Sequence, residues 1–118
     1  MAVRRTAVGR VTVLAAIGAF TGGDETDRLR EAILAEAAAG NTLLVLDLSE
    51  CAKMNSSGIG VLIEAYRSYT ERAGEIRLCG LQPRLASQLS TVGFLKFFGH
   101  HATVEEAVAA LTERAAGT

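Results

Sequence analysis

The strongest constraint on the fold is a change of hydrophobic periodicity near the middle of the chain. Residues 43–48 form a short run of Leu and Val around one Asp, which is long enough for a buried strand and too short for a helix. Downstream, apolar residues recur at helical spacing, at Ile59, Leu62, Ile63 and Tyr66. The polar segment that starts at Lys53 is therefore predicted to turn the chain from a strand into a helix.

Two serines, Ser56 and Ser57, lie at the predicted start of that helix. The first N–H groups of a helix have no partner inside it, and the helix dipole places partial positive charge at this end. The position therefore suits an anion, including one attached covalently to a hydroxyl. Asn and Ser are also preferred N-cap residues, so helix capping alone is an alternative explanation of Asn55, Ser56 and Ser57.

The N-terminus is predicted to form a hairpin at the edge of a sheet. Residues 3–8 and 11–17 are rich in apolar and β-branched residues, and the second stretch begins with the alternation Val-Thr-Val. Between them lies Gly9-Arg10, which suits a tight turn. These features favour two antiparallel strands.

A loop and a helix should follow the hairpin. The glycines within residues 18–23 indicate the loop. Asp24 or Thr26 is suited to cap a helix that runs to Ala38. Gly40-Asn41 should end this helix, because both residues tolerate the left-handed conformation found at helix ends.

A strand and a third helix are expected after the central helix, which should run to about Ala73 and end at Gly74. Residues 75–80 contain alternating apolar residues and predict a strand. A third helix should begin at Pro83, where a missing N–H costs nothing, and should close at Gly93.

The C-terminal region should contain a short strand and a last helix. Thr103 and Glu106 have the spacing of a capping box at the start of that helix. The alternation of strands and helices predicts an α/β fold, organised as one domain over residues 1–118. Its sheet should be mixed and mostly parallel, with the N-terminal antiparallel hairpin, right-handed crossovers and about four helices.

Charge and hydropathy exclude several classes of partner. The chain has 12 basic and 13 acidic side chains and a formal net charge of -1, which gives no reason to expect nucleic-acid binding. No apolar stretch approaches the roughly 18 residues of a membrane span, so no membrane partner is expected. Arg4-Arg5 and the apolar residues 11–20 are similar to a short signal peptide, but Arg10, Thr12 and Gly18 interrupt that pattern.

The two cysteines, Cys51 and Cys79, have no third cysteine or histidine at metal-ligand spacing. They are therefore expected to be small buried residues in a reducing compartment, and the protein is expected to be cytoplasmic. Neither a metal nor a cofactor is expected.

No catalytic constellation can be assembled from the sequence. Gly58-Ile59-Gly60 lacks the further glycines or the Lys-Ser/Thr pair of a phosphate-binding loop. A serine nucleophile would need a histidine base, and His100-His101 is more typical of a solvated pair. Glu105-Glu106 is explained by helix capping and Asp47 by a strand end. The protein is predicted not to be an enzyme.

A family resemblance extends over nearly the whole chain. It is carried by residues 46–49, 54–62, 74–81 and 92–98, in this order. Together these segments resemble the STAS domain of bacterial anti-sigma-factor antagonists. The motif is specific when the segment with the two serines, the glycine turn and the Gly-hydrophobic segment appear in this order, as they do here.

The resemblance implies a phosphorylation-controlled partner switch in transcription regulation. Such proteins bind an anti-sigma factor with serine kinase activity while unphosphorylated, and they release it when one serine is phosphorylated. A PP2C-type phosphatase resets the cycle. The resemblance places the acceptor at Ser56 and the partner-binding surface at Asn55, Ser56, Ser57, Gly58 and Ile59, with Gly58 allowing a partner to approach closely. A homodimer is compatible with these expectations.

Two departures from the family pattern leave an alternative open. Asn55 stands where the family usually has Asp, and residues 18–23 lack a commonly found acidic residue. The alternative is a constitutive STAS scaffold subunit, or a regulator of a non-sigma signalling or lipid-transport complex. In that case residues 94–98, which hold three of the four phenylalanines, would pack against a permanent partner; otherwise they are expected to pack in the core.

Overall fold

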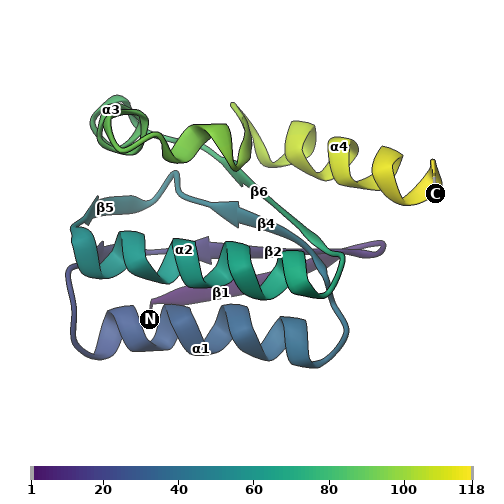
Figure 1. The fold of residues 1–118 in the computed structure, drawn as a ribbon, viewed down its shortest axis with the longest axis horizontal. Coiled ribbons are helices and arrows are strands. Elements are labelled where there is room, and N and C mark those ends of the chain that lie inside the picture. Colours follow the sequence, from purple (N-terminus) through teal and green to yellow (C-terminus); the bar gives the residue numbers. More distant parts are fainter. Residues whose placement is uncertain (1, 118) are drawn as a thin grey trace.

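The computed structural model describes residues 2–117. Its helices and strands alternate after an N-terminal hairpin, as predicted (Figure 1). In chain order the elements are β1 (Val3–Val8), β2 (Val11–Ala16), β3 (Gly18–Phe20), α1 (Asp24–Ala38), β4 (Leu43–Asp47), β5 (Cys51–Met54), α2 (Ser56–Glu71), β6 (Glu75–Cys79), α3 (Pro83–Thr91), the 3-10 helix η1 (Phe94–Lys96), β7 (Gly99–His101) and α4 (Val104–Ala116).

The main sheet is mixed and has the strand order β1-β2-β4-β6-β7. Strands β1 and β2 pair antiparallel around the turn at Gly9, whose φ of 61° is in the left-handed region. The pairs β2-β4, β4-β6 and β6-β7 are all parallel. The predicted fold class is confirmed, including the edge hairpin and the four α-helices.

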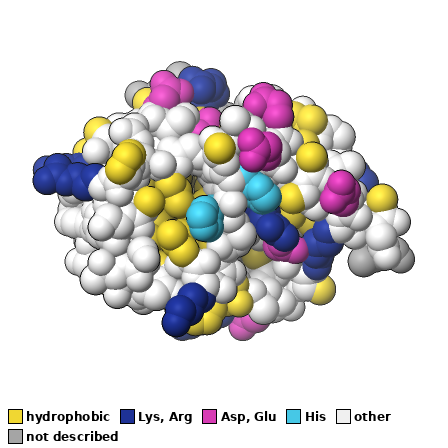
Figure 2. Space-filling model, turned by 90° about the horizontal axis from the view of Figure 1, so that it is seen from above, with side chains coloured by type: hydrophobic (Ala, Val, Ile, Leu, Met, Phe, Trp, Pro, Cys, Tyr) yellow, Lys and Arg dark blue, Asp and Glu magenta, His cyan; other side chains and the backbone are white. Residues whose placement is uncertain are grey.

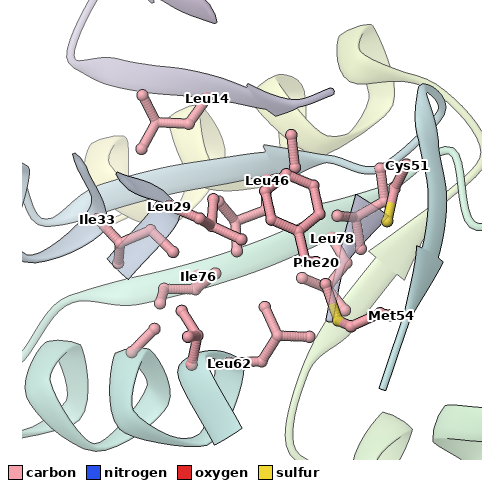
Figure 3. Packing of buried hydrophobic residues seen from close by; sticks show 14 of the residues in the cluster. Leu14, Phe20, Leu29, Ile33, Leu46, Cys51, Met54, Leu62, Ile76 and Leu78 are labelled. Carbon is pink, nitrogen blue, oxygen red and sulfur yellow. The ribbon is translucent and has the colours of Figure 1, made fainter. Parts of the chain in front are cut away.

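The helices cover the two faces of the sheet unequally. Helices α1 and α2 run side by side on one face, and α4 lies on the other (Figure 1). The larger core lies under α1 and α2 and also receives residues of α3 and η1. Figure 3 shows the Phe20 ring in the middle of this core, near Leu46 and Leu78. Phe20 is completely buried, which contributes about 2 kcal/mol to stability relative to an exposed ring.

The largest departure from the predicted fold is a second sheet of two short strands. The glycine pattern predicts a loop over residues 18–23, but residues 18–20 form β3, which pairs in parallel with β5. The predicted polar turn from Lys53 therefore begins inside a strand. Strands of three and four residues are too short for periodicity to reveal, and these two are held by the burial of Phe20 and Met54.

The cap predicted for α1 is wrong. The N-cap is Gly23, in a backbone conformation with φ 81°, and it provides no side-chain cap. Thr26 is instead buried inside the first turn, where its hydroxyl accepts a hydrogen bond from the Gly22 N–H at 2.8 Å. The start of α1 is set by the backbone conformation of Gly23, whose positive φ favours glycine. The side-chain capping preferences of Asp24 and Thr26 therefore do not determine where the helix begins.

The end of α2 also differs in detail from the prediction. The helix stops at Glu71, and the residue in the left-handed region is Ala73, with φ 57°, rather than Gly74. Gly74 is required for another reason, since a Cβ at this position would clash with the carbonyl oxygen of Thr42. The glycine therefore marks close packing at the start of β6.

The C-terminal elements largely follow the predictions. Pro83 is at the start of α3, and Gly93 ends that region with φ 74°. The expected short strand between α3 and α4 is β7, which contains His100 and His101, and residues 94–96 before it form η1. Thr103 caps α4 by accepting a hydrogen bond from the Glu106 N–H at 3.2 Å.

Candidate functional site

The start of α2 is fixed to the rest of the molecule by Asn55. The side-chain Oδ1 of Asn55 accepts hydrogen bonds from the N–H groups of Ser57, at 2.9 Å, and Gly58, at 3.4 Å. Its Nδ2 donates to the carbonyl oxygen of Thr21 at 3.0 Å, and its backbone N–H donates to the carbonyl of Phe20 at 3.3 Å. One side chain therefore caps α2 and ties it to the β3 region.

Gly58 lies at the most crowded point of the site. It is buried, and an added Cβ would clash with the Met54 side chain and lie 2.6 Å from the Phe20 carbonyl oxygen. The close approach that Gly58 permits is therefore made within the chain, against β3 and β5. Gly58 supports the site from inside rather than presenting a surface to a partner.

The two serines at the helix start have different surroundings. Both are exposed, but Ser57 faces the loop before α1: its Oγ would be 3.6 Å from a Cβ added to Gly22. Ser56 lines an open groove on the outer side of α2. Of the two hydroxyls, Ser56 is the one beside a space that a partner can enter.

The groove has a volume of about 670 Å³ and is mostly apolar. Its walls are the outer side of α2 and the segment around η1; they consist of Ser56, Ile59, Gly60, Ile63, Tyr66, Arg67, Thr70, Glu71, Val92, Phe94 and Phe97. Ile63 is 48% exposed and Phe97 is 63% exposed, which is unusual for large apolar side chains. Exposed apolar surface concentrated in a groove is typical of a binding site.

The phenylalanine segment divides between core and groove. Phe94 and Phe98 are buried, as expected, and their ring centroids are 4.8 Å apart. Phe97 points outward and packs edge-on against Tyr66, with centroids 5.6 Å apart. The sequence alone does not identify Phe97 or Val92 as surface residues. Ile63, however, lies on the same helical stripe as Tyr66, and that spacing is a signal for a shared surface.

The positive end of the α2 helix dipole, where Ser56 lies, has no negatively charged side chain of α2 beside it. The first turn of α2 contains no acidic residue, whereas Asp24, Glu25 and Asp27 occupy the first turn of α1. Negative charge at this end is favourable. The start of α2 can therefore accept an anionic group.

Neither thiol is suited to act as a nucleophile. Cys51 and Cys79 are both buried and free, which confirms the prediction of small buried residues. Burial raises the pKa of the Cys51 thiol. Burial, together with the charge of Asp47, raises the pKa of the Cys79 thiol to about 12. Both groups stay protonated at neutral pH, so they lack the reactive thiolate form.

The histidine pair lies away from the serines in sequence and in fold, on β7. Figure 2 shows the two histidines close together on one face, one of them beside a group of hydrophobic side chains. A nitrogen of Arg77 lies 3.5 Å from Nε2 of His101.

Within residues 2–117, no group of three or more His, Cys, Asp or Glu side chains could hold a metal ion. No described helix is long and apolar enough to cross a membrane.

Comparison with known families identifies the fold. The model of the STAS domain matches residues 3–107. The chain belongs to the STAS domain family. The mixed α/β sheet with its N-terminal antiparallel hairpin is therefore the STAS fold in the present chain.

Individual relatives of this STAS domain are anti-sigma-factor antagonists. An anti-sigma-B factor antagonist from Listeria monocytogenes is 34% identical over 58 residues, 49% of this chain and 51% of that protein, so the match spans about half of each. An anti-sigma factor antagonist from Mycobacterium paratuberculosis has a similar structure, with a TM-score of 0.80 at 23% identity, over 93% of this chain and 92% of its own. The phosphorylated form of the Bacillus cell fate determinant SpoIIAA has a TM-score of 0.75 at 22% identity, over 92% and 98% of the two chains. These structural similarities show a shared fold.

Proposed function

We propose that this STAS domain, over residues 1–118, is a cytoplasmic anti-sigma-factor antagonist that works by partner switching. Unphosphorylated, it binds an anti-sigma factor with serine kinase activity; phosphorylation of Ser56 by that kinase releases it, and a PP2C-type phosphatase restores binding. It is a binding module and not an enzyme. One observation carries the proposal: Ser56 is an exposed hydroxyl at a capped helix start, directly on the rim of an apolar groove.

The fold can accommodate a phosphate on Ser56. The group would add about -1.5 to -2 charges at pH 7. Because Ser56 is exposed and the first turn of α2 has no acidic side chain, the helix dipole would favour this charge by about 1 kcal/mol. Phosphorylation should therefore leave the domain folded.

A bound partner would respond in the opposite way. Ser56 lines the same groove as the exposed apolar residues Ile63 and Phe97. A partner that covers these residues removes water from the serine as well, and a doubly charged group is costly in such a place. The same modification can therefore be harmless to the fold and disruptive to the complex.

The substitution of Asn for the usual Asp at position 55 is compatible with this function. Asn55 keeps the capping oxygen, which accepts hydrogen bonds from the N–H groups of Ser57 and Gly58. Its Nδ2 also donates to the Thr21 carbonyl, which a carboxylate could not do. The exchange preserves the geometry of the serine and adds a neutral tie to the loop before α1.

The test uses purified protein and the kinase-type anti-sigma factors encoded in the same genome. Isothermal titration should show that Ser56→Ala binds its partner as wild type does and that Ser56→Asp binds about tenfold or more weakly. Incubation of wild type with that partner and ATP should add one phosphate, located at Ser56 by mass spectrometry.

The alternative of a constitutive scaffold subunit gives a different result. It predicts equal affinity of the Ser56→Ala and Ser56→Asp variants and no phosphate on Ser56 in protein isolated from cells. Both variants are informative because Ser56 is exposed and its side chain is not required by the core. Equal affinities would exclude the switch.

A further inference from the structure

Gly60 is a glycine that the fold of this chain does not require. It is exposed in the interior of α2, and a Cβ added there would meet no atom within 4 Å. Its φ is not among the positive values. Glycine in the middle of an exposed helix is destabilising relative to alanine, because it loses more conformational freedom on folding. Its presence therefore calls for an explanation outside the folded monomer.

The other glycines of residues 2–117 are explained by the fold itself. Those with open space around them, such as Gly9 and Gly93, have a positive φ that disfavours a side chain. Those without a positive φ are crowded, as Gly58 is by the Phe20 carbonyl and Gly74 by Thr42. Among the described glycines, Gly60 alone is neither conformationally special nor crowded.

The position of Gly60 connects it to the groove. Ser56, Gly60, Ile63, Arg67 and Thr70 follow one another at helical spacing along α2, and all five line the groove. The stripe is about 21 Å long, at 1.5 Å per residue. The missing side chain of Gly60 thus leaves a gap one turn from Ser56, where another backbone can approach α2 closely.

We propose that Gly60 is the crossing point for a helix of the anti-sigma-factor partner, which packs against α2 along this groove. This inference rests on the proposed function and adds the mode of recognition. The partner helix places apolar side chains over Ile63 and Phe97, and an acidic residue over the first turn of α2. It is a helix-in-groove contact in which small residues set how closely two helices approach.

Shape and charge favour this occupant. A straight stripe along one helix, with a second wall at Val92 and Phe97, fits an amphipathic helix with anchors one turn apart. The first turns of α2 and α3 lack acidic residues, whereas those of α1 and α4 contain them, and of the two only α2 begins at the groove. An acidic side chain of the partner complements this end, and a phosphate on Ser56 would take its place and repel it.

The experiment measures binding to the purified anti-sigma factor that wild type binds, together with the Tm of each variant. Gly60→Ala should keep or raise the Tm, because the new methyl group enters open space, yet weaken binding by about fivefold or more. Ile63→Ser should weaken binding by about tenfold. The matched control is Val8→Ser: Val8 is 44% exposed, against 48% for Ile63, but lies on β1 outside the groove, so binding should stay within about twofold of wild type.

A second pair of variants tests the charge. Ser56→Glu and Ser56→Gln add side chains of equal size, and only the first should repel an acidic residue. We expect Ser56→Glu to bind about tenfold more weakly than Ser56→Gln, with the difference reduced in high salt. Equal losses for Glu and Gln would refute the acidic contact.

The outcomes separate this inference from the proposed function. If Ser56→Asp weakens binding while Gly60→Ala and Ile63→Ser bind like wild type, the switch stands and the helix-in-groove mode is wrong. If Gly60→Ala lowers both the Tm and the affinity, glycine is needed by the fold and the inference is also overturned. If wild type binds none of the genome's kinase-type anti-sigma factors, the proposed function fails and the inference fails with it.

Discussion

The helix starts of α2 and α4 share the same capping chemistry but differ in the charge of their first turns. Asn55 caps α2 and Thr103 caps α4, each through a side-chain oxygen that accepts a backbone N–H. The first turn of α4 then carries Glu105 and Glu106, so its dipole has its counter-charge within the chain. The first turn of α2 carries Ser56, Ser57 and Gly58 and no acid.

The third helical position shows the difference most clearly. In α4 it is Glu106, an exposed residue, and in α2 it is Gly58, a buried one. The start of α2 is therefore packed against the core, and its first turn supplies no negative charge to the positive end of the helix dipole. The start of α4 is complete in itself and lies at the surface. The comparison teaches that two helix starts with the same kind of cap can differ in the burial and in the charge of their first turns.

The largest expected effect comes from placing alanine at this third position in both helices. Gly58→Ala should lower the free energy of unfolding by about 3 kcal/mol, since the methyl group has no room beside Met54 and the Phe20 carbonyl. Glu106→Ala should lower it by about 0.3 kcal/mol. Urea denaturation of both variants measures the difference. Similar losses would show that the two helix starts are equally peripheral.

An intermediate effect is expected from removing the caps. Asn55→Ala should cost about 2 kcal/mol, because it removes both the cap and the hydrogen bond to Thr21, whereas Thr103→Ala should cost about 1 kcal/mol. Asn55→Ser keeps a capping oxygen and loses only the bond to Thr21, so its stability should lie between Asn55→Ala and wild type. Thermal unfolding of wild type and the three variants in a single buffer measures these differences in stability. If Asn55→Ser were as unstable as Asn55→Ala, the tie to Thr21 would account for the whole effect.

The smallest effect concerns charge at the uncompensated helix start. Ser56→Asp should raise the free energy of unfolding by about 0.5 kcal/mol at low ionic strength, relative to Ser56→Asn, and the gain should fade as salt is added. The corresponding removal of charge in α4, Glu105→Gln, should lower stability by a similar amount. Chemical denaturation at two salt concentrations tests both. A destabilising, salt-independent Ser56→Asp would mean that the α2 start does not accept negative charge.

The sequence is most informative where local chemistry decides the structure. The run at residues 43–48 and the helical stripe after it predict β4 and α2 because burial on a sheet and on a helix face leaves distinct periodicities. Pro83 and Thr103 mark helix starts through constraints within one turn. For the same reason, the amino-acid pattern alone is enough to place Ser56 at a helix start.

The parts that sequence could not predict depend on contacts between distant segments. Strands β3 and β5 are stabilised by pairing with each other, and neither has a recognisable pattern alone. The outward direction of Phe97 depends on its packing against Tyr66. The different surroundings of Ser56 and Ser57 depend on the position of the Gly22 loop, which no local rule specifies.

The hydrogen bond from Asn55 to Thr21 spans 34 residues of sequence, and it makes the site a property of the folded chain rather than of a linear motif. A peptide of residues 51–66 contains the sequence on both sides of Ser56 but lacks Phe20 and Thr21, to which the helix start is attached. Such a peptide should be a poor substitute for the domain in any assay of recognition. An enzyme that recognises Ser56 in this geometry would modify only the folded chain. The modified serine would therefore show that the chain had already folded.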